Sequence, residues 1–201
     1  MYALSPPPLI TPLDHGPYIG HIRTPSHPPL NHTPHTTSTP PLQVLGVEHS
    51  SVAATLNNLA GLCFSHGDIE DAKDYYEESL RLRRQAFGDE HPSVAESLNN
   101  IGLLLFAQGS YTDAQPLFER AITIKKEAFG DKHLSTASSQ HNLAILLHKL
   151  KRFGEAETLY AVALHVRTAF LGPAHPDTQS TMEKLNELGG DKTSAGELVS
   201  V

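Results

Sequence analysis

The stretch "GDEHPSVAESLNN", residues 88–100, decides the fold of this chain. It places His91 just ahead of a run with helical character, and further histidines stand at His49, His133 and His175, each 42 residues from the next. A fixed interval of this kind has two explanations. The histidines could be a ladder of metal ligands, or they could mark a structural repeat.

The sequence around each histidine repeats as well. Three blocks align without gaps: residues 46–87, 88–129 and 130–171. Apolar residues recur in register at Leu59, Ile101 and Leu143, and at Tyr76, Phe118 and Tyr160. Self-similarity with a period of 20 to 50 residues is typical of solenoids. The pattern therefore predicts an all-α repeat domain.

Each block contains two helical patterns joined by a turn. In the middle block the first predicted helix runs from Pro92 to Ala107, and the second runs from Thr112 to Ala128. Gly109 lies between them and can adopt the left-handed conformation that ends a helix. In the third block Lys151 takes the place of this glycine. We therefore expect the third turn to be less tightly specified.

The chain before the repeats has a different composition. Residues 1–45 hold 11 of the 15 prolines. Proline fixes φ and has no amide donor, so a helix or a sheet ladder cannot be sustained there. We expect this Pro-, His- and Thr-rich segment to be disordered, and the repeat domain to span residues 46–189.

After the third block the pattern begins again at His175. Residues 172–189 are therefore predicted to form a partial repeat that caps the solenoid. Its helix carries apolar residues on one face: Met182, Leu185 and Leu188. The glycines at 189 and 190 are expected to stop this helix, which leaves residues 190–201 as a flexible tail.

Composition restricts the classes of function. The net charge of -7 argues against binding nucleic acid through its phosphates. A single cysteine allows no intrachain disulfide. No apolar run approaches the roughly 20 residues that span a bilayer, and the N-terminus does not resemble a secretory signal. We expect a soluble, cytoplasmic protein that binds neither nucleic acid nor membranes.

Motifs with catalytic spacing are not found in the sequence. It has no phosphate loop, no paired zinc motif and no nucleophile elbow. Cys63 occupies the position of Leu105 and Leu147, so we interpret it as a small core residue. The sequence thus predicts a protein that is not an enzyme and has no cofactor and no metal site.

The repeat itself resembles a known family. Small residues stand on the first helices at Ala60, Gly102 and Ala144, and on the second helices at Ala72, Ala114 and Ala156. This pattern resembles the tetratricopeptide repeat, although the usual period is 34 residues rather than 42. The motifs "HPSVAESLNNIG" and "AQPLFERAI" are similar to repeats of the kinesin light chain and nephrocystin type. The resemblance implies a right-handed α-α superhelical solenoid over residues 46–189.

A stacked solenoid decides between the two explanations of the histidines. Equivalent residues of adjacent repeats lie at least one helix packing distance apart, roughly 8–10 Å. A zinc ion needs donors about 2 Å away, so neighbouring repeats cannot share one. We interpret each histidine as a structural residue at the start of a first helix. There its ring can pack on the preceding repeat and donate to an exposed carbonyl.

The resemblance also implies a concave groove lined by the first helices. Carried over by position, its peptide-binding residues are Asn57, Asn58, Phe64, Asn99, Asn100, Leu103, Phe106, His141, Asn142 and Ile145. An amide carries a donor and an acceptor, so we expect Asn57 and Asn99 to face a bound peptide. Asn58, Asn100 and Asn142 have two interpretations: they bind peptide, or they bond carbonyls of the neighbouring repeat.

The expected partner is a protein or peptide with apolar anchors. Family members that bind chaperone tails clamp a carboxylate with lysine and asparagine, but Gly61, Leu103 and Ile145 occupy the second of these positions here. Hsp70 and Hsp90 tails are therefore not expected partners. The sequence predicts an adaptor or scaffold. The alternative is a fragment or regulatory repeat region of a larger kinesin-light-chain-like or nucleotide-binding-domain protein, and the oligomeric state stays open.

Overall fold

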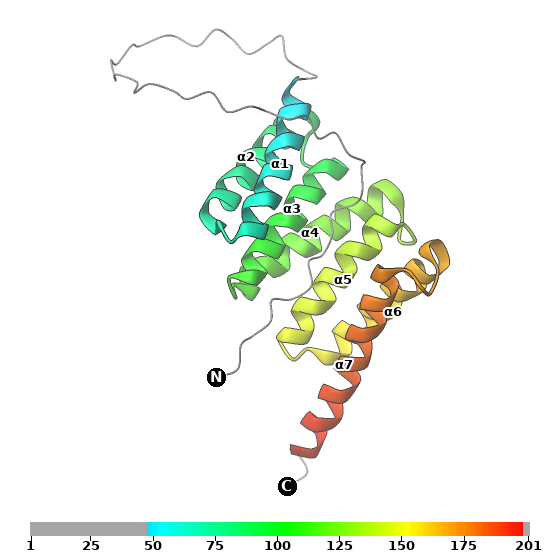
Figure 1. The fold of residues 1–201 in the computed structure, drawn as a ribbon. Coiled ribbons are helices and arrows are strands. Elements are labelled where there is room, and N and C mark those ends of the chain that lie inside the picture. The colour runs from blue at the N-terminus through cyan, green and yellow to red at the C-terminus, as the bar shows by residue number, and fades with distance from the viewer. Residues whose placement is uncertain (1–47, 199–201) are drawn as a thin grey trace, which may run out of the picture. The chain divides into compact units, whose positions relative to one another are not determined.

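The computed structural model describes residues 48–198, with side chains from residue 50 to residue 192. The predicted disorder of residues 1–45 and the side chain of His49 lie outside the described residues. The described residues form seven α-helices (Figure 1): α1 (Glu48–His66), α2 (Ile69–Phe87), α3 (Pro92–Ala107), α4 (Tyr111–Phe129), α5 (Leu134–Lys149), α6 (Phe153–Leu171) and α7 (Pro176–Leu198).

The helices pack in the order in which they follow along the chain. α1 packs on α2, α3 on α4 and α5 on α6, and each second helix also packs on the first helix of the next repeat. The predicted solenoid of helix pairs is confirmed. The predicted bounds of the middle first helix, Pro92 to Ala107, are those of α3, and α4 is one residue longer at each end than predicted.

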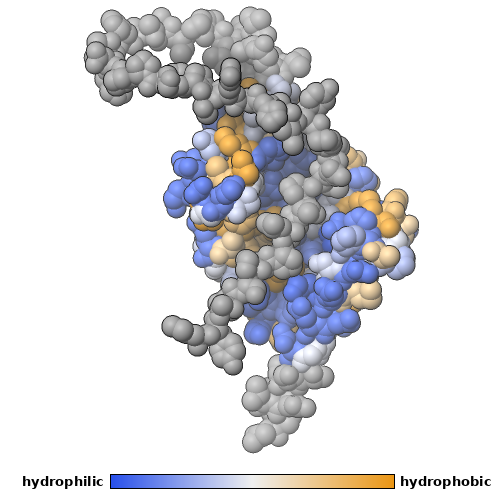
Figure 2. Space-filling model, viewed as in Figure 1, coloured by the Kyte–Doolittle hydropathy of each residue, from blue (hydrophilic) through white to orange (hydrophobic). Residues whose placement is uncertain are grey.

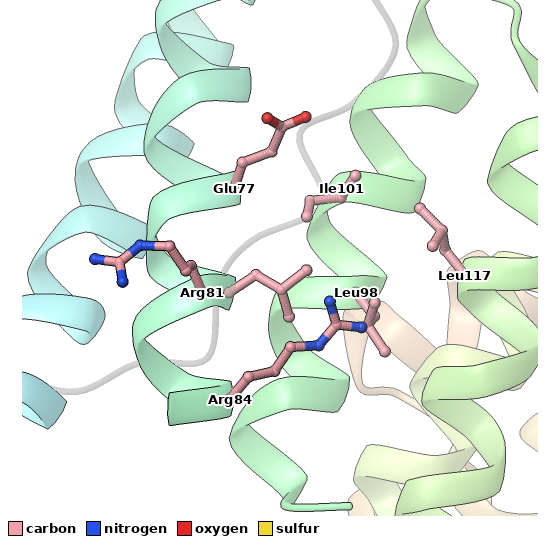
Figure 3. A pocket seen from close by; sticks show the side chains of 7 residues that line it. Glu77, Arg81, Arg84, Leu98, Ile101 and Leu117 are labelled. Carbon is pink, nitrogen blue, oxygen red and sulfur yellow. The ribbon is translucent and has the colours of Figure 1, made fainter. Parts of the chain in front are cut away.

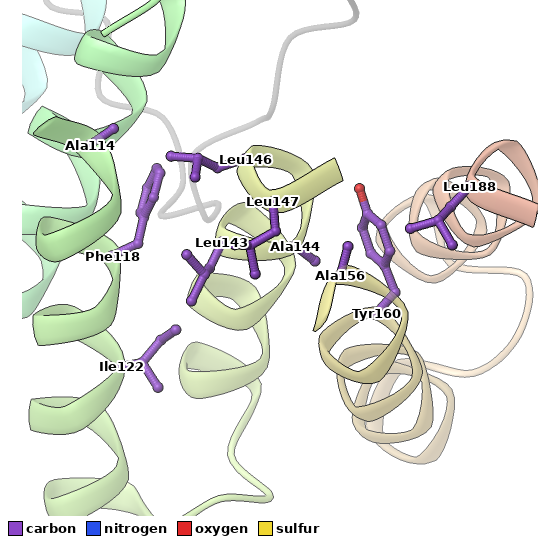
Figure 4. Close-up of a cluster of buried hydrophobic side chains, with 10 residues drawn as sticks. All are labelled: Ala114, Phe118, Ile122, Leu143, Ala144, Leu146, Leu147, Ala156, Tyr160 and Leu188. Atoms are coloured by element: carbon purple, nitrogen blue, oxygen red, sulfur yellow. The ribbon is translucent and has the colours of Figure 1, made fainter. Parts of the chain in front are cut away.

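The core runs through the interfaces between repeats. Figure 4 shows Phe118 of α4 facing Leu143 and Leu146 of α5, and Tyr160 of α6 facing Leu188 of α7. Phe118 and Tyr160 are fully buried, and burying an aromatic side chain of this size stabilises the fold by about 1.5–3 kcal/mol. Gly102 lets the Phe118 ring approach closely, because a Cβ atom at residue 102 would lie 2.8 Å from Cε1 of Phe118.

Three of the periodic histidines cap helices. The Nδ1 atoms of His91, His133 and His175 accept hydrogen bonds from the backbone N–H two residues ahead, over 3.2, 3.1 and 3.2 Å. Phe87 stacks on His91 at 4.4 Å and Phe129 stacks on His133 at 4.6 Å between ring centroids. Their predicted structural role is confirmed. Their rings accept hydrogen bonds, however, where the sequence analysis expected them to donate, because the first turn of a helix presents unpaired N–H groups.

A second periodic feature was missed in the sequence. Arg83, Lys125 and Arg167 are also 42 residues apart, and each is about 95% buried, with exposed fractions of 6%, 5% and 6%. Each cation donates to a hydroxyl of the following first helix: Arg83 to Ser97 at 3.0 Å, Lys125 to Ser139 at 2.9 Å and Arg167 to Thr181 at 2.7 Å. Each also donates to a backbone carbonyl ten residues ahead: those of Ser93, Ser135 and Asp177. A buried charge is tolerated only with such partners. These cations therefore join consecutive repeats.

The third turn keeps the geometry of the other two. Lys151 has a φ of 63°, in the left-handed region that Gly67 and Gly109 occupy in the equivalent turns. The N–H of Arg152 donates to the carbonyl of Leu147 at 2.9 Å, as Ser110 does to Leu105. The neighbouring helices impose the turn even where the side chain disfavours it.

The C-terminal helix α7 differs from the expectation in two ways. α7 continues through Gly189 and Gly190 to Leu198, so these glycines do not stop it. Asp191 bonds His148 at 2.9 Å and Lys192 pairs with Glu157, and these contacts hold the extended helix against α5 and α6. Met182 is 40% exposed, although Leu188 on the same helix is buried as expected.

Leu59 of α1 is more exposed than its equivalents in the later repeats. Leu59 is 37% exposed, whereas the equivalent Ile101 and Leu143 are 9% and 7% exposed. The difference arises because α2 and α4 cover the later two residues, while no described helix precedes α1.

Candidate peptide-binding groove

The predicted groove residues all lie on the first helices α1, α3 and α5. Two pairs of first helices also contact each other: α3 packs on α5, and α5 packs on α7. Within the described residues no comparable contact joins α2 to α4 or α4 to α6. In a curved stack, the elements that lie closer together are on the inner side. The first helices therefore lie on the inner side of the stack and form the wall on which the groove is predicted from the sequence.

The asparagines of this wall are joined across repeats. Nδ2 of Asn100 donates to Oδ1 of Asn57 over 2.9 Å, and Nδ2 of Asn142 donates to Oδ1 of Asn99 over 3.1 Å. Asn100 and Asn142 are expected from the sequence either to bind peptide or to bond carbonyls of the neighbouring repeat, and neither expectation includes this pairing of side chains. The residues of each pair are 43 positions apart, one more than the repeat period, because the partner lies in the adjacent row of side chains on the preceding first helix.

The four asparagines of these pairs differ in exposure. Asn57, Asn99 and Asn100 are half-buried, and Asn142 is buried with 7% exposed. Asn58 is exposed. The asparagine amide groups are therefore accessible on α1 and α3, whereas the amide of Asn142 on α5 is largely covered.

His141 does not line the groove surface as expected. It occupies the position of Asn57 and Asn99, but only 5% of it is exposed. Its ring lies edge-on to Tyr160 at 5.6 Å between centroids, and its Nδ1 atom has no hydrogen-bond partner among the described residues. Burial, and then the charges of Arg167 and Lys184, lower the pKa of His141 to about 3. The ring is therefore neutral at pH 7. The packing of α7 on α5 and α6 encloses it.

The apolar residues of the predicted groove are half-buried. They are Phe64, Leu103, Phe106 and Ile145. Phe106 contacts Tyr111 of the following helix at 5.2 Å between ring centroids, and Leu103, Phe106 and Ile145 pack against the same core cluster. Each therefore has one side anchored in the core and leaves part of its surface for a partner.

A separate hollow of about 460 Å³ lies outside this wall (Figure 3). It is lined by Glu77, Leu80, Arg81 and Arg84 of α2, Leu98 and Ile101 of α3, and Leu117 of α4. Arg81 bonds Glu78 at 2.7 Å and Arg84 pairs with Asp89 at 2.9 Å. Its cationic groups are thus already engaged. This hollow is not predictable from the sequence pattern, because it arises only where two repeats meet.

The chemistry of the groove is that of hydrogen bonding and apolar contact. Within residues 50–192 no group of three or more His, Cys, Asp or Glu side chains could hold a metal ion. Cys63 is a free thiol packed against the cluster of Ala60, Ala72 and Tyr76, as the sequence predicts for a small core residue. No described helix is both long and apolar enough to cross a membrane.

Comparison with protein families assigns the fold. The family model of the tetratricopeptide repeat matches residues 51–127 and again residues 93–169. The chain belongs to the tetratricopeptide repeat family. The overlap of the two matches on residues 93–127 reflects the internal repeat, since the middle repeat fits the model in either register. A search of curated proteins found no match for this tetratricopeptide repeat chain.

Solved structures show the same tetratricopeptide fold. Kinesin light chain repeats of Podospora anserina, described as nearly identical TPR-like repeats, share 24% identity with a TM-score of 0.65, covering 77% of this chain and 74% of that one. BtubC of P. vanneervenii shares 23% identity with a TM-score of 0.64, covering 73% and 57%. The first TPR of Spaghetti (RPAP3), bound to the HSP90 peptide SRMEEVD, shares 14% with a TM-score of 0.53, covering 72% and 95%.

Proposed function

We propose that this chain is a non-enzymatic adaptor or scaffold that holds a peptide or a partner helix in the groove lined by α1, α3 and α5. The observation that carries the proposal is the pairing of Asn57 with Asn100 and of Asn99 with Asn142. Domains of this family generally bind protein partners, and one structural neighbour was solved with a bound peptide.

The amide pairs supply the groups that a peptide backbone needs. Each pair uses one Oδ1 atom and one Nδ2 hydrogen, and within the described residues nothing occupies the remaining polar groups. Nδ2 of Asn57 can then donate to a peptide carbonyl, and Oδ1 of Asn100 can accept from a peptide N–H. Because the pairing also holds the four side chains in place, little entropy is lost when a peptide binds.

The composition of the wall favours a partner with apolar anchors. Leu103, Phe106 and Ile145 offer half-exposed apolar surface beside the amides. Gly61, Leu103 and Ile145 stand where chaperone-binding members carry a clamp for a terminal carboxylate. An internal segment with leucine-like or aromatic anchors therefore fits this groove better than an acidic C-terminal tail.

The test is selection of peptides on the full chain from a random displayed library, followed by titration of the synthetic peptides. The double variant N57A/N99A should weaken binding by about 1–3 kcal/mol, since each hydrogen bond contributes roughly 0.5–1.5 kcal/mol. This is a loss of about fivefold to 150-fold in affinity. The double variant N57D/N99D keeps the Oδ1 acceptors for Asn100 and Asn142 but loses the donors, so it should also lose binding with less effect on stability. E127A, on the exposed side of α4, is the matched control.

Two results would contradict the proposal. One is a library selection that yields no peptide with saturable binding to the full chain. The other is an asparagine double variant that binds every selected peptide normally but melts much earlier, because these residues would then serve only the stacking of the repeats.

A further inference from the structure

Helix α1 presents an apolar face that the later first helices bury. Val52 is 48% exposed, Leu59 is 37% exposed and Leu62 is 54% exposed, and Thr55 between them is exposed as well. Their spacing of three, four and three residues places the four side chains on one side of the helix. Figure 2 shows hydrophobic surface over α1 beside the hydrophilic surface of α2.

The same four positions are buried in the other first helices. On α3 they are Val94, Ser97, Ile101 and Leu104, which are 0%, 0%, 9% and 0% exposed. On α5 they are Thr136, Ser139, Leu143 and Leu146, which are 0%, 0%, 7% and 0% exposed. The preceding second helix covers them: Ala72 and Tyr76 of α2 share a core cluster with Ile101 and Leu104. The face on α1 is thus equivalent to the surfaces of α3 and α5 that a second helix covers.

The polar position of this face offers a hydrogen-bond acceptor, which a cation fills at each of the other junctions. Ser97, Ser139 and Thr181 each accept a hydrogen bond from a buried cation of the preceding second helix. Thr55 is their equivalent on α1, and its hydroxyl donates to the carbonyl of Ser51 at 2.9 Å, as Thr181 does to Asp177 at 2.8 Å. The Thr55 hydroxyl thus makes the same backbone hydrogen bond as Thr181 at the junction of α6 and α7. α1 carries no Lys, Arg, Asp or Glu between residues 49 and 67, so no charge opposes an incoming cation.

We propose that the face of Val52, Thr55, Leu59 and Leu62 binds an amphipathic helix of another protein that carries the pattern Ala-x3-Tyr/Phe-x3-Leu/Ile-x2-Arg/Lys. This pattern is the part of α2, α4 and α6 that faces the next repeat, as in Ala72, Tyr76, Leu80 and Arg83. The partner is therefore the second helix of another 42-residue repeat. This site is distinct from the groove and does not depend on the function proposed for it.

The residues that stand one repeat before α2 in this sequence do not supply the pattern. In the 42-residue register, Pro34, Ser38 and Pro41 stand where Tyr76, Leu80 and Arg83 stand one repeat later. Residues 34–41 contain three prolines, which do not fit the interior of a helix, and the cation is missing. A second copy of the chain does not fit either, because α2, α4 and α6 already use this surface for α3, α5 and α7.

The probe for this site is a synthetic peptide with the α2 sequence, residues 69–87, labelled with a fluorophore. A hydrocarbon staple replaces the exposed Glu70 and Asp74, because short isolated helices are marginal in water. Titration of the full chain by fluorescence anisotropy should show saturable binding. L62E in the chain should weaken it by about tenfold or more, since a charge would enter the apolar contact. V162E, at a residue of α6 that is 38% exposed, should leave binding unchanged.

A second peptide tests the cation. Replacing Arg83 of the peptide by methionine keeps its length and apolar stem, so the loss of the bond to Thr55 should weaken binding several-fold. N57A/N99A in the chain should not affect this titration, which separates the site from the groove.

Four results would overturn the proposal: no saturable binding up to about 1 mM peptide, binding insensitive to L62E, binding equal for the two peptides, or binding that appears only after deletion of residues 1–41. Sedimentation of the chain alone gives a further test. A dimer that L62E dissociates would assign the face to a second copy and contradict the stated partner.

Discussion

The Nζ atom of Lys125 lies 2.9 Å from Oγ of Ser139, a residue of the next repeat, with only 5% of the lysine exposed. Arginine holds the equivalent place at residues 83 and 167. A guanidinium keeps its charge when buried, whereas an ammonium can lose its proton. The middle junction is therefore the one whose charge depends on pH.

The stability of the middle junction should rise with pH in alkaline solution. Burial lowers the pKa of Lys125 from 10.5 to about 8. Between about pH 8 and 10.5 the unfolded chain binds a proton that the folded chain has released, so the free energy of unfolding increases with pH. This contribution reaches about 3 kcal/mol at most, at 1.36 kcal/mol per unit of pKa. Urea unfolding at several pH values should show the rise in the natural chain and not in K125R.

The exposed Lys126 provides the control for this experiment. K126R should follow the pH dependence of the natural chain, because this side chain reaches solvent. Parallel curves for the natural chain and K125R would show that Lys125 stays charged in the folded state.

Acid should destabilise the third repeat through His141. Its pKa is lowered to about 3, mainly by burial and further by Arg167 and Lys184. The unfolded histidine takes up a proton near pH 6.5 while the folded one stays neutral, so the free energy of unfolding falls as pH decreases through this window. Between pH 6.5 and 5 we expect a loss of about 2 kcal/mol from this group.

The matched variant for the acid effect is H141N, which restores the residue of the equivalent positions 57 and 99. The difference in unfolding free energy between the natural chain and H141N isolates the histidine, because all carboxylates are common to both. A difference that does not vary between pH 7 and pH 5 would contradict the prediction.

Two glycines of the first helices should respond oppositely to alanine. At Gly102 a Cβ atom would lie 2.8 Å from the buried ring of Phe118, so G102A should cost about 1–3 kcal/mol. At Gly61 the Cβ atom would lie 3.5 Å from the Tyr76 hydroxyl, which is an ordinary contact. G61A should therefore stabilise the chain by up to about 1 kcal/mol, because alanine is the better helix former. Thermal unfolding of the two variants checks both signs.

The capping role of α7 should depend on Leu188. Leu188 is 1% exposed and packs in the cluster of Tyr160, whereas Met182 on the same helix is 40% exposed. L188A should cost about 2–5 kcal/mol, and M182A should cost much less. Truncation after Gly172 removes the cover of Tyr160 and should cause aggregation. A soluble monomer of unchanged stability after this truncation would show that the third repeat needs no cap.

The linear sequence determined the helix pairs of this protein. Its 42-residue period aligns the three repeats with one another, so a helix found in one block is found in the others. Local signals mark the helix ends: Pro92 suits the first turn of α3, and Gly109 allows the left-handed turn after it. These signals depend only on residues within one or two helical turns along the sequence. They can therefore be recognised without knowledge of the tertiary contacts.

The tertiary structure alone decided the environment of each side chain. Lys125 and Arg167 recur at the repeat interval and could have been recognised as a row with Arg83, but their burial follows from the next helix lying over them. Asn57 and Asn100 are 43 residues apart, one more than the period, because the stacking of two helices brings neighbouring rows into contact. Asn57 and His141 share a place in the repeat, yet one is half-exposed and the other buried. Position in the stack separates them: α7 packs over the last full repeat, and no described helix covers the first.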